Sequence, residues 1–230
     1  MKKILFSAAL LLGGTALFAQ KKTQLILKGG VNFANISVED DGDVNEASML
    51  TSFHAGLGVN VPITPGFYFQ PALLVTGKGS KLQSGSTTDN TYYKSTTNPI
   101  YLELPLNFIG KIPLAENTGI ILGAGPYVAM GIAGKNKVEG KFSGVAFNSE
   151  NKIDFSNDDP TTVNYEEDAG IGKMKRFDLG ANLLAGLDFG RVSLTGQYGL
   201  GFTKIASGTD NSDDNKNKHR VWGISLGLKL

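Results

Sequence analysis

Apolar and polar residues alternate along most of the chain, and this pattern limits the possible folds more than any other feature. Between residues 100 and 108, Ile, Leu and Phe occupy every second position, with Tyr, Glu, Pro and Asn between them. A period of two is typical of a β-strand whose two faces meet different surroundings. The pattern recurs in eight segments, about 24–35, 52–61, 67–78, 100–108, 119–133, 177–189, 192–203 and 222–230. Several reach the length of about 9–11 residues that a tilted strand needs to cross a bilayer.

The connections between these segments alternate between long and short. The long ones cover about 37–50, 79–98, 134–175 and 204–219, and the short ones about 63–66, 113–118 and 190. Barrels of bacterial outer membranes have tight periplasmic turns and long outer loops. The sequence therefore predicts an all-β fold, an eight-stranded antiparallel up-and-down transmembrane β-barrel with both termini in the periplasm.

Large aromatic residues of the apolar faces lie near the strand ends. Those expected at the outer ends are Phe33, Phe53, Phe177, Phe202 and Trp222, and those at the inner ends are Phe67, Phe69, Phe108 and Phe189. Two such girdles are favoured at the two membrane interfaces. The alternative is a soluble sandwich with these aromatics in its core, which would also bury Leu104, Leu183 and Leu226 and expose Glu103 and Asp178.

The opposite faces carry polar residues that a barrel would enclose. We expect a polar lumen network of Lys28, His54, Glu103, Asn107, Asp178, Asp188, Arg191 and Gln197. The lumen of an eight-stranded barrel is just wide enough for side chains to fill it, and charges there must be paired. Lys28 or Arg191 should therefore pair with Glu103, Asp178 or Asp188, which favours a plugged lumen over a pore.

The first residues have the pattern of a secretory signal peptide. Met1-Lys2-Lys3 precedes an apolar run, 4–18, and the small residue Ala19, so we expect cleavage after Ala19 and a barrel domain over residues 20–230. No later segment has the 18 apolar residues of a helical span. Cysteine is absent, which excludes disulfides and thiol chemistry, and the net charge of +1 disfavours a nucleic-acid partner.

Candidate chemistry is sparse. The two histidines, His54 and His219, are expected near the outer end, where a lipid-modifying rim enzyme could use them with Ser52. Neither lies in a catalytic motif, so we expect no enzyme, with His54 in the lumen and His219 at the rim. The acidic loops 40–43 and 210–215 lack the spacing of a calcium loop, so no metal or cofactor is expected.

Two further features concern single segments. Loop 134–175 contains Phe142, Phe147, Phe155 and Tyr165, which suggests partial order, in the form of a short hairpin extending the fifth and sixth strands. This loop is the best candidate for a surface that binds a partner. Prolines at positions 71, 105 and 126 predict local bulges, since each removes a hydrogen-bond donor from a strand.

The chain resembles the Bacteroidota outer-membrane β-barrel family, the PorT-like barrels. The resemblance is carried by residues 28–33, 101–106, 123–127, 178–180, 197–201 and 222–230, of which Tyr-Leu-Glu-Leu-Pro-Leu at 101–106 is the most specific. It implies an eight-stranded barrel in the outer membrane of a Gram-negative bacterium and transfers no catalytic residue. Such barrels commonly end in an aromatic residue, which the barrel insertion machinery reads, whereas this chain ends in Leu230.

Three functions are compatible with these features. The first is a non-enzymatic barrel that serves envelope structure or surface binding, with outer-membrane lipid, the insertion machinery and a surface partner at loop 134–175 as its partners. The second is a small channel for tiny solutes. The third is a rim enzyme that modifies lipid through His54 and His219.

Overall fold

The computed structural model describes residues 23–37, 47–86, 88–156, 173–205 and 217–230. Within these ranges, the regular secondary structure consists of β-strands. No helix in the described residues is long and apolar enough to cross a membrane. The predicted signal peptide, 1–19, and the acidic loops at 40–43 and 210–215 lie outside the described residues.

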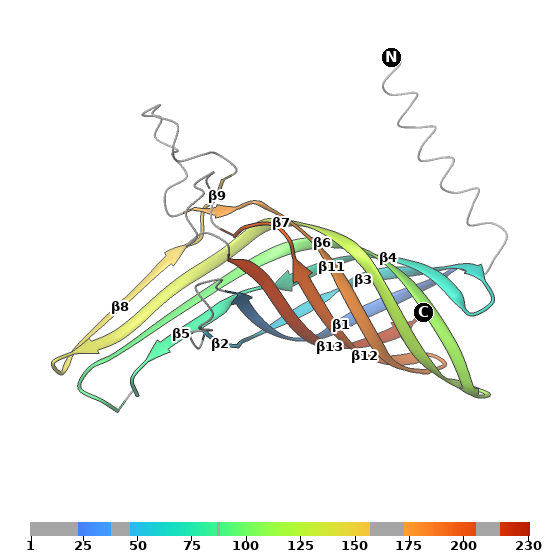
Figure 1. The fold of residues 1–230 in the computed structure, drawn as a ribbon, viewed down its shortest axis with the longest axis horizontal. Coiled ribbons are helices and arrows are strands. Elements are labelled where there is room, and N and C mark those ends of the chain that lie inside the picture. The colour runs from blue at the N-terminus through green and yellow to red at the C-terminus, as the bar shows by residue number, and fades with distance from the viewer. Residues whose placement is uncertain (1–22, 38–46, 87, 157–172, 206–216) are drawn as a thin grey trace, which may run out of the picture.

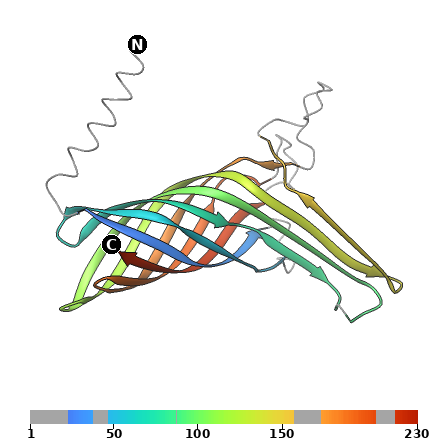
Figure 2. The same ribbon diagram turned by 180° about the vertical axis from the view of Figure 1, so that it is seen from behind.

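Eight strands of the described chain close into an antiparallel ring (Figures 1 and 2). In ring order they are β1 (Gln24–Ser37), β3 (Leu50–Thr64), β4 (Phe67–Gly77), β6 (Tyr92–Ala115), β7 (Thr118–Phe142), β11 (Phe177–Phe189), β12 (Val192–Gly201) and β13 (Lys218–Lys229). Each strand pairs with the next along the chain, and β13 pairs with β1, where Phe33 faces Trp222. The predicted up-and-down barrel is confirmed.

The apolar faces of the strands point outward. Leu104, Leu183 and Leu226 have exposed fractions of 43%, 51% and 57%, whereas Glu103 and Asp178 have exposed fractions of only 6% and 2%. A soluble sandwich requires the reverse, because its apolar faces would form the core. The sandwich alternative is therefore wrong, and the described apolar side chains form an outward band that suits hydrocarbon.

Tight turns define one end of the barrel, which we call the inner end. They join β3 to β4 at Pro65 and Gly66, β6 to β7 at Glu116 and Asn117, and β11 to β12 at Gly190 and Arg191. Gly66 and Gly190 have φ angles of 79° and 76°, a backbone conformation that glycine adopts without steric cost. The opposite end, which we call the outer end, is reached by the longer connections.

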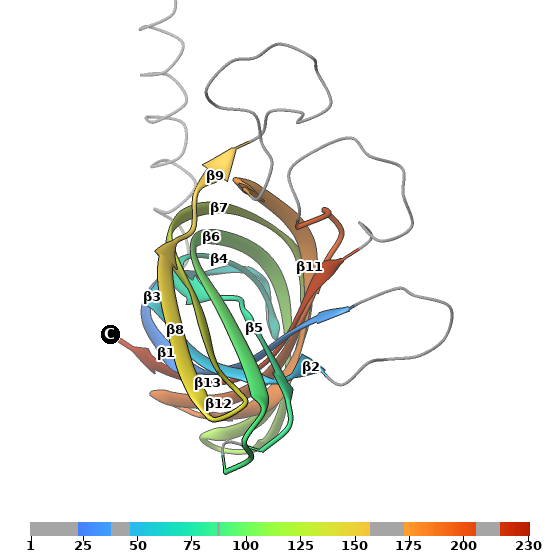
Figure 3. The same cartoon turned by 90° about the vertical axis from the view of Figure 1, so that its left-hand side faces the viewer.

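Two of the predicted long loops, 79–98 and 134–175, are largely strand where the structure describes them, which corrects these loop ranges. β6 and β7 remain paired far beyond the ring, from Pro99 opposite Gly134 to Tyr92 opposite Lys141. β8 (Val145–Lys152) continues the sheet beside β7, while β5 (Ser80–Ser84) and β2 (Ala47–Ser48) continue it beside β6. Figure 3 looks onto this end of the molecule, and we call these paired segments the outer extension.

The predicted hairpin exists, but it belongs to different strands from those expected. β7 and β8 form it, so it continues the fifth ring strand, β7, and not the sixth, while the outer part of β6 pairs with the other side of β7. The two-residue strands β9 (Phe155–Ser156) and β10 (Met174–Lys175) pair with each other next to it. The backbone groups of the outer extension form hydrogen bonds with neighbouring strands. The alternation of the sequence did not reveal this pairing, because polar residues occupy both faces near 94–98.

The prediction of bulges at Pro71, Pro105 and Pro126 is wrong. The register of β4 with β6 is the same on both sides of Pro71, and the register of β6 with β7 is the same on both sides of Pro105. The register shifts lie instead at Ile100–Tyr101, Pro113–Ala115 and Pro62–Thr64. Each of these is at or next to another proline, Pro99, Pro113 or Pro62.

Candidate functional site

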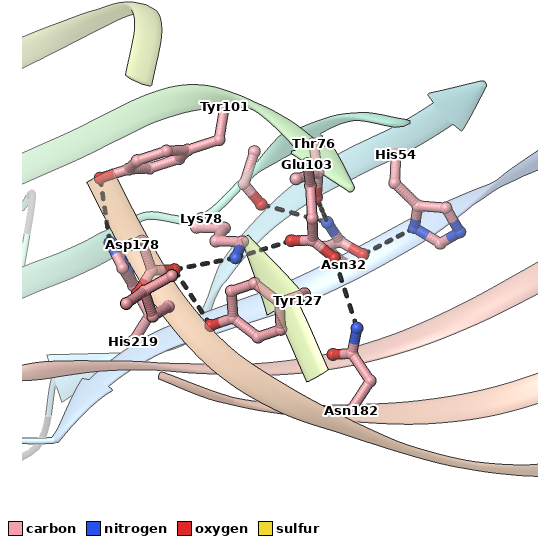
Figure 4. Close-up of polar contacts among 12 residues, drawn as sticks. Asn32, His54, Thr76, Lys78, Tyr101, Glu103, Tyr127, Asp178, Asn182 and His219 are labelled. Carbon is pink, nitrogen blue, oxygen red and sulfur yellow. Dashed lines mark hydrogen bonds and ion pairs between the residues drawn. The ribbon is translucent and has the colours of Figure 1, made fainter. Parts of the chain in front are cut away.

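A buried ion cluster occupies the lumen near its outer end (Figure 4). The Nζ atom of Lys78 lies 2.6 Å from an oxygen of Glu103 and 2.9 Å from an oxygen of Asp178, and all three side chains are almost fully buried. Tyr127 places its ring 3.7 Å from the same ammonium and donates a hydrogen bond of 3.0 Å to Asp178. Opposite charges brought together in this way offset the large cost of removing each from water.

Neutral polar side chains extend the cluster across the lumen. Asn182 donates to Glu103 at 3.4 Å, and Thr203 donates to Asp178 at 3.0 Å. Three strands, β6, β7 and β11, and the segments after β4 and β12 contribute to this set, so the network ties opposite walls of the barrel together. The space left among these side chains is about 10 Å³, which is room for about one water molecule.

Both histidines are enclosed. The Nδ1 atom of His54 lies 2.7 Å from the amide oxygen of Asn32, and the amide nitrogen of Asn32 donates to Thr76 at 2.8 Å. His219 contacts the hydroxyl of Tyr101 at 3.2 Å and has an exposed fraction of 1%. The expectation that His219 lies at the rim is therefore wrong. Every second residue of β13 from His219 to Gly227 is buried, so His219 is the first residue of the inward face.

The inner half of the lumen has an apolar layer followed by a second ion cluster. Ile109, Ile121 and Leu184 pack together inside the barrel, with Tyr68 against them. Beyond them, towards the inner end, Asp188 binds Lys111 at 2.8 Å and also Lys229. The lumen is thus filled in consecutive levels of polar, apolar and again polar side chains.

The structure places the predicted lumen residues as follows. Lys28, His54, Glu103, Asn107, Asp178, Asp188 and Gln197 are on inward faces. Lys28 donates a hydrogen bond of 2.7 Å to Gln70 and, contrary to the expectation, forms no ion pair with a carboxylate among the described residues. Arg191 is the exception, since it is exposed in the turn before β12.

Three lysines of the two ion clusters were missed. Lys78 lies directly after β4 and continues the inward face formed by Gln70, Leu74 and Thr76, which are buried. Lys111 has the parity of Glu103 and Asn107 on β6, and Lys229 follows the inward face of β13. Lys78 and Lys229 fall inside the predicted segments 67–78 and 222–230, and Lys111 lies three residues beyond segment 100–108, so following the inward face to the ends of the strands would have found all three.

The nine predicted girdle aromatics have the outward parity of their strands. They are Phe33, Phe53, Phe67, Phe69, Phe108, Phe177, Phe189, Phe202 and Trp222. At the outer end Trp222 lies against Tyr198, with ring centroids 4.3 Å apart, and at the inner end Phe108 lies 5.3 Å from Phe69. Aromatic side chains at both edges of an apolar band suit the two interfaces of a bilayer.

The outer extension is an amphipathic sheet, and its first face is charged. Lys94 and Lys137 both bind Glu139, at 3.0 Å and 2.6 Å, and Lys135 binds Glu150. Hydrogen bonds from Lys137 and Lys94 lower the pKa of Glu139, and a hydrogen bond from Lys135 lowers the pKa of Glu150. These pairs are open to solvent, as expected for a surface in water.

The second face of the extension carries apolar side chains. Phe142 and Val145 at the hairpin tip have exposed fractions of 70% and 72%, and Tyr93 and Leu82 are also exposed. The ring of Phe147 covers Gly140, where a Cβ atom would clash with it. An exposed apolar patch of this kind is a common mark of an interaction surface.

The edge of the extension is formed by β8. In the described residues, β8 is the last strand of the sheet and pairs only with β7, and all its residues are exposed. The backbone N–H of Ile153 donates to Gly134, so, by the alternation of antiparallel pairing, the N–H groups of Asn148 and Glu150 point away from β7. A free edge with outward N–H groups can accept a further strand.

The chain is weakly similar to several solved structures. Ail of Yersinia pestis is 11% identical with a TM-score of 0.41, and Neisserial surface protein A is 12% identical with a TM-score of 0.40. Each comparison covers 91% of this chain and 100% of the other. No curated protein matched the chain. The family model of the outer membrane protein beta-barrel domain matches residues 18–207, and the chain therefore belongs to that family.

Proposed function

We propose that this outer-membrane β-barrel protein is a non-enzymatic surface protein that is closed to solutes and binds an extended peptide segment at its outer extension. Within the family we assign it to the PorT-like barrels of the Bacteroidota, exported through cleavage after Ala19. The observation that carries the proposal is the β8 edge, an exposed strand with outward N–H groups beside an apolar patch.

The closed lumen is supported by its packing. Lys78, Glu103, Asp178 and Tyr127 fill one level, and Ile109 belongs to an apolar layer below it. An ion would have to displace both levels, which makes the channel alternative unfavourable. In planar bilayers with potassium chloride, we expect the protein to give no large stable conductance, and a steady open state would contradict the closed lumen.

The burial of His54 and His219 argues against the rim enzyme. Both rings lie inside the barrel wall, so a lipid ester in the outer leaflet could not reach them. Ser52 is on the same strand as His54, but its hydroxyl is buried. The side chains of a lipid-modifying site would instead have to line an opening towards the bilayer.

The β8 edge can be tested with one residue. A library of displayed random peptides is selected on the protein in detergent, and binding is measured to the wild type, Asn148→Pro and Asn148→Ala. Proline removes the outward N–H without removing a bond to β7, so we expect binding to fall at least about tenfold. Asn148→Ala keeps the N–H and should bind like the wild type.

The result can also go against the proposal. Equal binding to Asn148→Pro and the wild type would exclude strand addition at β8, and failure to select any peptide would do the same. Heat-modifiable gel mobility checks that both variants remain folded barrels.

A further inference from the structure

The first face of the outer extension carries more lysines than its own carboxylates can neutralise. Residues directly opposite one another in antiparallel strands share a face of the sheet, so the pairing of β5, β6, β7 and β8 defines this face. Its charged residues are Lys81, Lys94, Lys135, Lys137, Glu139, Lys141, Glu150 and Lys152. Adding Asp89 and Asp154, which lie in the connections next to these strands, still leaves six lysines against four carboxylates. The described strands of the extension are therefore basic on one face and uncharged on the other.

One of these lysines lies on the β8 edge itself. Lys152 is directly opposite Lys135, and like charges in such a pair repel each other. The ammonium of Lys135 binds Glu150 at 2.5 Å, whereas Lys152 has no ion-pair partner among the residues that the structure describes. Because Lys152 is also exposed, its ammonium can bind a carboxylate that comes from another chain.

The register of β8 decides which of its side chains a further strand would meet. The backbone N–H groups of alternate residues, Asn148 and Glu150 among them, point away from β7. On the first face, side chains of an added strand would lie opposite Asn148, Glu150 and Lys152. On the second face, one of them would lie opposite Phe147. Cβ atoms of such opposite residues are about 4.5–5.5 Å apart, which is close enough for an ion pair or an apolar contact.

We propose that the peptide bound at the β8 edge is acidic, with a carboxylate opposite Lys152 and an apolar residue opposite Phe147. This inference rests on the proposed function, because it specifies the ligand of the same site. The carboxylate is confined to one position, since an acidic residue opposite Glu150 would be repelled. Phe147 has an exposed fraction of 45%, so an apolar residue beside it buries further apolar area. The other lysines of the first face attract an acidic peptide over a longer range and speed its association.

Peptides selected from a displayed random library on the wild-type protein in detergent are the probes for this inference. We expect them to share one aspartate or glutamate. One selected peptide, and the same peptide with the matching amide at that position, are then titrated calorimetrically into the wild type and Lys152→Gln. In the wild type the carboxylate should strengthen binding about threefold. In Lys152→Gln the acid and amide peptides should bind alike, because the partner of the carboxylate is gone.

The matched control is Lys81→Gln, which removes the same charge from the same face, with β6 and β7 between it and β8. There the threefold advantage of the acid peptide should persist. Peptides that lose affinity in Asn148→Pro but show no acidic residue in common would overturn the inference and leave strand addition at β8 intact. An advantage that survives in Lys152→Gln would overturn the pairing with Lys152. Equal binding to Asn148→Pro and the wild type would instead overturn the proposed function, and the inference with it. Heat-modifiable gel mobility checks that each variant is a folded barrel.

Discussion

The barrel wall and the outer extension are built from the same two long strands but have opposite outward faces. On β6 the outward residues of the barrel include Leu102, Leu104 and Phe108, whereas the same parity further out gives Lys94 and Thr96. The hydrogen-bonded ladder with β7 continues through both regions. Backbone pairing is therefore the same in both regions, and only the side chains differ between the part that faces hydrocarbon and the part that faces water.

The position of this change can be located along the strand. Pro99 faces Gly134, and the register shift between Ile100 and Tyr101 lies directly beside it. Apolar outward residues lie on the barrel side of this point and charged ones on the other side. We infer that the outer membrane interface crosses β6 and β7 here, and the predictions below compare matched changes on either side.

The largest expected difference concerns the ion pairs. Lys78→Met leaves Glu103 and Asp178 buried without their shared cation, which should lower the free energy of unfolding by about 3–5 kcal/mol. Lys135→Met breaks the pair with Glu150, in which the lysine side chain is 68% exposed, and should leave stability unchanged within error. Urea unfolding in lipid vesicles measures both.

Equal effects of these two changes would contradict the comparison. A second variant, Asp178→Asn, tests whether a loss of stability in Lys78→Met comes from the lost ion pair or from the methionine side chain itself. It keeps the shape of the side chain but removes one of the two negative charges beside Lys78, so it should also destabilise the barrel, and by less than Lys78→Met, because Glu103 still pairs with the ammonium.

The next prediction introduces a charge on the outward face of one strand at two positions. Leu104→Lys places an ammonium in the apolar band and should cost about 2–4 kcal/mol if the residue lies near the middle of the bilayer. Thr96→Lys lies on the same strand at the same parity, eight positions towards the outer end, and should change stability by less than about 0.5 kcal/mol. Vesicle unfolding again provides the measurement, and a similar loss in both would move the membrane boundary outward.

The sequence was sufficient to predict the barrel and its sidedness because alternation depends directly on the two surroundings of a strand. Segment 100–108 alone separates Leu104 from Glu103 correctly. A hairpin was expected from the aromatics of loop 134–175, but the outer part of β6 was missed because residues 94–98 are polar throughout. Alternation gives no apolar contrast over these residues, and only the pairing of β6 with β7 reveals the strand.

The central cation was missed for a different reason. Lys78 lies after the last residue of β4, between glycines 77 and 79, where a sequence pattern favours a turn. Its carboxylate partners come from β6 and β11, which are separated from it by up to 100 positions. Such pairing depends on the register and the curvature of the closed ring, which local alternation does not specify.

A smaller effect is expected within the extension itself. Phe147 has an exposed fraction of 45% and covers Gly140, so Phe147→Ser should weaken the β7–β8 hairpin by about 1 kcal/mol, from the loss of half-buried apolar area. Phe142→Ser, at an exposed fraction of 70%, is the matched control and should have less effect. Hydrogen exchange of the β8 amides measures the hairpin, while vesicle unfolding should find the barrel unaffected by either change.

The smallest effect is a pH dependence of the order of the extension. The pKa values of Glu139 and Glu150 are lowered by hydrogen bonds from lysines, so the folded hairpin binds protons less readily than the unfolded one. The ion pairs therefore contribute fully above the ordinary glutamate pKa of about 4.3, and the contribution is lost as the pH falls through the lowered values. Exchange protection of β8, corrected for the intrinsic exchange rate, should decrease on going from pH 6 to pH 3. In the double variant Glu139→Gln, Glu150→Gln this decrease should disappear, and a decrease that persists would mean that groups other than these two carboxylates control the order of the extension.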